Sequence, residues 1–171
     1  AELEKLLSLP DDPERELAYR RSLAEEEDGL KAIVARKMPE WEKTYGIPFS
    51  DHRVEFIIRR SLERQSDMEA TVEEIQAMDR AARHFALQFF QKSAIEIAFS
   101  DDALDALVES QGKEPPDSGE FMKRNFQNYD HGLNLIREKT GKSQFIITAA
   151  GIENPEGYLN SLIQEAYRQK S

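Results

Sequence analysis

The 171-residue sequence contains no cysteine, and this absence excludes disulfides and thiolate metal sites. No apolar run approaches the ~20 residues of a membrane-spanning helix, so we expect no membrane partner. No secretory signal precedes the first predicted helix. These absences together predict a cytoplasmic protein.

Basic residues are also scarce relative to acidic ones. The 23 lysines and arginines face 33 aspartates and glutamates, which gives a formal net charge of −10. An acidic surface repels a phosphate backbone, so we expect no nucleic-acid partner. Charged residues make up 33% of the chain, against a usual ~25%, and this favours a helical protein with solvated faces over a β sandwich.

Complete catalytic or phosphate-binding motifs are missing as well. Neither Gly-x-x-x-x-Gly-Lys-Ser/Thr nor Gly-x-Gly-x-x-Gly occurs in the sequence. None of the three histidines, His52, His84 and His131, belongs to a His-Glu-x-x-His or Glu-x-x-His motif. His52 and His131 each follow an aspartate, but adjacent helical residues point about 100° apart. An enzyme with a carboxylate–histidine site therefore ranks third among our hypotheses, and we expect no metal.

The most informative segment that is present runs from Ile95 to Val108. Its first half alternates apolar and polar side chains, as a half-buried strand does. Ser100 can cap a helix, and the two aspartates that follow suit the positive end of the helix dipole. The apolar residues beyond them recur at helical spacing. This pattern predicts a short strand that leads directly into a capped helix.

A similar five-residue motif occurs 50 residues earlier. Ile47-Pro-Phe-Ser-Asp matches Ile97-Ala-Phe-Ser-Asp, and each copy lies between a long and a shorter predicted helix. The match is consistent with an internal duplication. The alternative is that helix–strand–helix units often share a Phe-Ser-Asp cap. On either explanation we expect a short strand at residues 47–50.

The remaining periodicities are mainly helical. They predict helices over 1–9 and about 14–45, with a kink or break before Pro39. A stripe with steps of four and three predicts one helix that packs against the preceding helices: Met122, Phe126, Tyr129, Leu133, Ile136. Four aromatic residues, one of them in this stripe, are assigned to the core: Trp41, Phe89, Phe90 and Tyr129. The fold class is therefore α+β and mainly α-helical, with three short strands, at 47–50, 97–100 and 145–148, in helix–strand–helix units.

From about residue 72 the order of elements resembles a known family. A long helix, a strand and helix reading Ala98-Phe-Ser-Asp-Asp-Ala-Leu-Asp-Ala-Leu107, a loop, a second long helix and the strand at 145–148 resemble the small C-terminal domain of AAA+ unfoldases, most closely the ClpX branch. The resemblance covers about 80 residues. It divides the chain into a helical region, 1–71, and an AAA+ small-domain-like region, 72–171.

The resemblance implies a lid domain that couples the ATP state between subunits and is not catalytic alone. Its partners would be its own large ATPase domain and the neighbouring subunits of a ring, with ATP and Mg²⁺ bound by the parent protein and no cofactor in this chain. The family's sensor motif, Gly-Ala-Arg, aligns with residues 117–121, which contain no arginine. Lys123 and Arg124 follow shortly after and are the candidate nucleotide-binding residues. Alternatively, both are solvated on the polar face of their helix.

Two functional hypotheses follow. The first is the lid region of a Clp-type AAA+ ATPase, and the alternative is a free-standing helical module that binds another protein through an exposed apolar groove. The sequence begins with Ala1 in a helical pattern, from which we expect a fragment of a longer polypeptide. The basic cluster Arg59, Arg60 and Arg64 is interpreted as a solvated helix face, with binding of an anion or acidic partner as the alternative.

Overall fold

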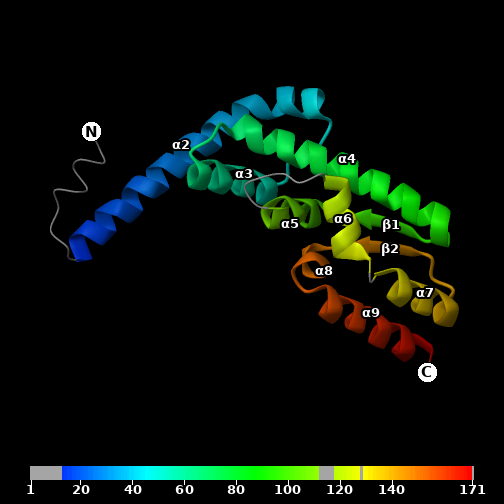
Figure 1. Cartoon of the computed structure of the whole chain (residues 1–171). Helices are drawn as coiled ribbons and strands as arrows, with labels where there is room; N and C mark the ends of the chain where they lie inside the picture. The colour runs from blue at the N-terminus through cyan, green and yellow to red at the C-terminus, as the bar shows by residue number, and fades with distance from the viewer. Residues whose placement is uncertain (1–12, 112–117, 128, 171) are drawn as a thin grey trace.

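The computed structural model describes residues 13–111, 118–127 and 129–170, and the predicted helix over 1–9 lies outside these ranges. Helices dominate, with one small sheet of two strands, which confirms the mainly helical α+β fold class (Figure 1). The elements are α2 (Pro13–Tyr45), α3 (Asp51–Arg64), α4 (Met68–Ser93), β1 (Glu96–Phe99), α5 (Asp101–Gln111), α6 (Ser118–Phe126), α7 (Tyr129–Thr140), β2 (Gln144–Ile147), α8 (Ala149–Glu153) and α9 (Pro155–Lys170).

Helix α2 is the longest element. It continues without interruption through Pro39, so the helix predicted over 14–45 is confirmed and the predicted break near Lys37–Pro39 is wrong. Its buried residues, Val34 and Trp41, both lie in the C-terminal half. In Figure 1 the blue N-terminal half projects past the other helices, whereas the cyan half lies against the body of the molecule. Only the second half of α2 therefore belongs to the core.

The two Phe-Ser-Asp motifs cap helices but differ in what precedes them. The Ser50 side chain accepts the Arg53 N–H at the start of α3, and Ser100 accepts the Ala103 N–H at the start of α5. Residues 47–50 are not a strand, so the third predicted strand is wrong. Pro48 has no N–H to offer a neighbouring strand, and its carbonyl instead accepts a hydrogen bond from Arg53. The shared cap is thus observed, and the duplication stays a prediction.

Strands β1 and β2 form a parallel pair, and the predicted strands at 97–100 and 145–148 are confirmed within one residue. The register pairs Glu96 with Gln144 and Phe99 with Ile147. Parallel neighbours require a long crossover, and here the chain between them forms α5, α6 and α7. Side chains of Ile97, Phe145 and Ile147 face the core, while the alternate residues on both strands are exposed or partly exposed.

The stripe from Met122 to Ile136 is fully buried, as predicted, but it spans two helices and not one. The Phe126 ring lies 5.7 Å from Phe85, 5.2 Å from Phe99 and 5.1 Å from Tyr129. Near the break, Asn125 donates its side-chain amide to the Phe121 carbonyl, a local bond that competes with helix continuation. Steps of four and three cannot reveal such an interruption, because both helices keep their apolar residues on the same side.

The chain after β2 closes the core. Tyr129 donates its hydroxyl to the Gly151 carbonyl at 2.7 Å, which joins α7 to α8. Asn154 immediately precedes α9, and α9 contributes the buried Ala166. Phe90, which the sequence assigned to the core, is 49% exposed, so that assignment is wrong, and Tyr167 on α9 is 50% exposed. Both occupy outward positions on helices whose other faces already fill the core.

Candidate functional site

A buried ion pair joins α3 to α5 at the point where the two capped helices meet. Arg53 Nε lies 3.0 Å from Asp105 Oδ1, and the two side chains are 0% and 1% exposed. The remaining guanidinium nitrogens of Arg53 donate to the carbonyls of Pro48 at 2.6 Å and Asp101 at 3.2 Å. A buried arginine is tolerated only when its donors are used in this way. Arg53 thus ties both Phe-Ser-Asp segments together.

The second carboxylate oxygen of Asp105 faces a histidine. Asp105 Oδ2 is buried, has no hydrogen-bond partner within the described ranges, and lies 3.4 Å from Nδ1 of the exposed His52. Burial raises the pKa of the Asp105 carboxyl, while Arg53 and His52 oppose that shift. A carboxylate beside an imidazole can orient the ring through one of its nitrogens. This arrangement could therefore fix the orientation of the exposed His52 ring.

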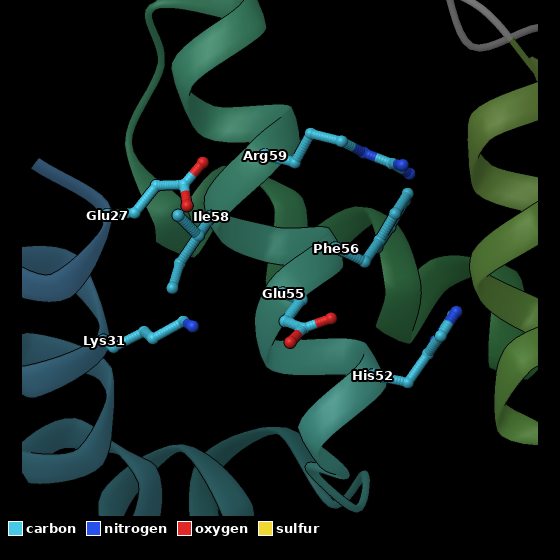
Figure 2. Close-up of a pocket in the computed structure, with 7 residues that line it drawn as sticks. All are labelled: Glu27, Lys31, His52, Glu55, Phe56, Ile58 and Arg59. Atoms are coloured by element: carbon cyan, nitrogen blue, oxygen red, sulfur yellow. The ribbon is translucent and has the colours of Figure 1, made fainter. Parts of the chain in front are cut away.

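An open cleft of about 360 Å³ lies between α2 and α3, beside His52. Figure 2 shows Glu27 and Lys31 on α2 across from the α3 side chains. Its lining is mixed in charge: Glu27, Lys31, His52, Glu55, Phe56, Ile58 and Arg59. None of these residues carries a hydroxyl or thiol nucleophile. Among the described residues, no three His, Cys, Asp or Glu side chains approach closely enough to share a metal ion.

The basic cluster of α3 is occupied by acidic groups of this chain. Arg60 is 5% exposed and donates to Glu74 at 2.9 Å and to the Val108 carbonyl at 3.2 Å. Arg64 donates to the same Glu74, and Arg59 pairs with Glu109. Interpreting this cluster as a solvated helix face is therefore wrong for Arg60. The arginines position α3 against α4 and α5.

Lys123 and Arg124, the residues predicted to bind nucleotide, are exposed on α6. The Lys123 ammonium lies 3.9 Å from the Glu120 carboxylate, and both side chains are largely in solvent. Neither residue lines the cleft between α2 and α3. The structure therefore does not bring them together with the Arg53–Asp105 pair, and their role stays a prediction.

A third region combines exposed apolar side chains with the open face of the sheet. A groove of about 600 Å³ runs over β1, β2 and α9, lined in part by Ala98, Ile146, Tyr158 and Leu162. Ile146 is 65% exposed there. A second groove, of about 390 Å³, separates α4 from β1. Exposed apolar surface of this kind is typical of protein contacts.

Sequence reasoning did not find Asp105 or its pairing with Arg53. The signal was present in part, since Asp105 interrupts an otherwise apolar helix face four residues after Asp101. Within the described ranges, no helix is long and apolar enough to cross a bilayer. Comparisons with family profiles, curated proteins and solved structures return no significant match to this chain.

Proposed function

We propose that this chain is the lid region of a ClpX-like AAA+ ATPase, in which it couples the ATP state between subunits without being catalytic alone. The observation that carries the proposal is the order α4–β1–α5–α6–α7–β2 with β1 and β2 parallel. That order matches the elements implied by the resemblance, with the second long helix divided into α6 and α7. The crossover places both strands and α6 against one core.

The proposal assigns Lys123 and Arg124 to the nucleotide phosphates of the parent protein. Their exposure leaves both cations accessible to an adjacent domain. Arg124 can bind a phosphate through two parallel hydrogen bonds, whereas Lys123 provides a single charge. The large ATPase domain would supply the remaining donors and Mg²⁺, because phosphate binding requires several converging groups.

The reading frame upstream of Ala1 provides the first test. A glycine-rich Walker A loop encoded there is expected, and a start codon immediately before Ala1 would contradict the lid assignment. In the full polypeptide, Arg124→Ala should lower ATP turnover at least about tenfold if it stabilises transferred charge. Lys43→Ala is a matched control, because Lys43 is an exposed cation on α2. Equal rates for the two variants would remove Arg124 from the proposal.

Calorimetry of the 171-residue chain tests the claim that it has no nucleotide site of its own. We expect no tight binding of Mg²⁺–ATP, because one exposed cation contributes on the order of 1 kcal/mol whereas micromolar affinity needs ~8 kcal/mol. The net charge of −10 further opposes a polyanion. A dissociation constant in the low micromolar range would overturn the lid proposal.

The second candidate function is a helical module that binds another protein. It is favoured by the grooves beside the sheet and by the exposed apolar residues near them, Leu87 at 55%, Phe90 at 49% and Ile146 at 65%. Ile146→Glu would distinguish it, because this change should abolish partner binding and leave the thermal unfolding midpoint nearly unchanged. A free-standing module would bind that partner without any ATPase domain.

A further inference from the structure

The N-terminal half of α2, residues 13–29, forms a largely exposed arm. None of its residues is buried, and the first buried residue of α2 is Val34. Figure 1 shows this blue segment projecting away from the body. Leu17 and Tyr19 are each 53% exposed. A helix of about this length is only marginally stable without packing, so an arm this exposed would gain stability from a partner.

The apolar line that packs α2 into the core continues along the arm. Tyr19, Leu23, Leu30 and Val34 follow one another at steps of four, seven and four, which keeps them on one side of the helix. Val34 is fully buried, and Leu30 packs against the core. The same spacing forms the seam between paired helices in coiled coils. Tyr19 and Leu23 therefore present a short seam beyond the body.

Basic and acidic residues are separated along the arm, and this separation determines in which relative direction two arms can pair. Residues 13–21 contain three arginines and two glutamates, whereas residues 22–28 contain four acidic residues and no basic one. Two arms aligned in parallel would place acidic half against acidic half. Two antiparallel arms would place the basic half of each against the acidic half of the other.

We propose that the arm, residues 13–29, pairs antiparallel with the same arm of a second copy of this chain. Centred near Leu23, the pair places Arg20 and Arg21 of one copy beside Glu26 and Glu25 of the other. The interface is two-fold symmetric, so it closes as a dimer. The antiparallel arrangement also keeps the two bodies at opposite ends, which reduces repulsion between chains of net charge −10.

Sedimentation equilibrium with charge-reversal variants tests this pairing. The unmodified chain should dimerise, and its dimer dissociation constant should increase as the salt concentration rises from about 50 mM to about 500 mM. Arg20→Glu/Arg21→Glu and Glu25→Lys/Glu26→Lys should each raise the dimer dissociation constant about tenfold or more. An equimolar mixture of the two variants should restore a heterodimer. The control, Arg36→Glu/Lys43→Glu, reverses two exposed cations on the body half of α2 and should leave dimerisation unchanged.

Single cysteines define the direction of pairing, because the sequence has none of its own. Leu23→Cys lies near the two-fold axis and should form an interchain disulfide under mild oxidation. In the antiparallel pair, two copies of Tyr19→Cys lie about 12 Å apart along the axis, beyond disulfide reach. Equal cross-linking at both positions would indicate parallel arms.

Three results would overturn the proposal. They are an unmodified chain that is monomeric at all salt concentrations, a dimer that survives the arm reversals, and an unmodified chain that binds a different protein through the arm without pairing with itself. Circular dichroism of each variant establishes that its body remains folded, so a lost dimer is not mistaken for a lost fold.

Discussion

Two junctions hold the molecule together by opposite means. At the α3–α5 junction, one buried guanidinium satisfies a carboxylate and two carbonyls. Where α4, β1, α6 and α7 meet, the rings of Phe85, Phe99, Phe126 and Tyr129 pack with centroids 5.1 to 5.7 Å apart. The first junction depends on one guanidinium group and its three hydrogen-bond acceptors, whereas the second distributes its stabilisation over many van der Waals contacts.

This difference determines how each junction should fail. Removing one member of a buried ion pair leaves the other charge without compensation, and its desolvation cost is then unopposed. Removing one ring from an apolar cluster leaves a cavity, which neighbouring side chains partly fill. The polar junction should therefore be more sensitive to single substitutions than its small number of contacts suggests.

The largest expected effect is that of Arg53→Ala. The change leaves the Asp105 carboxylate, which is 1% exposed, without its ion-pair partner and removes a large buried side chain. The free energy of unfolding should therefore fall by about 5 kcal/mol. Urea denaturation measures this difference. Arg53→Met/Asp105→Leu should recover at least half of the loss, because it removes both charges. A double variant no more stable than Arg53→Ala would show that hydrogen bonds to the Pro48 and Asp101 carbonyls dominate.

The apolar junction should respond to Phe126→Ala with a loss of about 3–5 kcal/mol. Phe126 is 2% exposed and contacts three other rings. Phe126→Leu retains most of the volume and should cost clearly less. The same urea titration compares the two variants, and an unchanged midpoint for Phe126→Ala would argue against the packing of α6 on α4.

A smaller effect is expected for Tyr129→Phe, which keeps the ring and removes only the hydroxyl. The Gly151 carbonyl then loses its hydrogen-bond donor, and we expect the free energy of unfolding measured by urea denaturation to fall by about 1–2 kcal/mol. Tyr158→Phe is the matched control, since its hydroxyl donates to the Ile146 carbonyl in an exposed position. An equal cost for both would mean that burial of the Tyr129 bond adds nothing.

The smallest expected effect is on the pH dependence of folding stability, and its direction differs between the carboxylates of Asp105 and Glu69. Burial raises the pKa of Asp105 from its ordinary value of 3.8, so the folded state binds more protons and Asp105 favours folding increasingly as pH falls through that raised pKa. The hydrogen bond from Lys37 lowers the pKa of Glu69 from its ordinary value of 4.5. The contribution of Glu69 to folding stability is therefore present above pH 4.5 and is lost at lower pH. Asp105→Asn and Glu69→Gln should therefore change the pH profile of stability in opposite directions; profiles that shift in the same direction would refute the assignment.

The sequence predicts local features of this fold more accurately than distant ones. Ser100 as a cap and the stripe through Phe126 follow from neighbouring residues, and both are observed. The strand expected at 47–50 fails because a matching motif does not provide a partner strand, and strand formation requires one. Arg53 and Asp105 are 52 residues apart, and nothing in either local pattern specifies that they meet.

The parallel register of β1 and β2 also constrains the order of folding. Glu96 pairs with a residue 48 positions later, and the intervening chain must first be drawn into a closed loop. Because such long-range pairing carries its entropic cost before any contact forms, we expect the sheet to appear late, after α5 and α7 have docked. The Glu96 amide, which donates to the Ser143 carbonyl, should then exchange with solvent deuterium only when the surrounding helices open together.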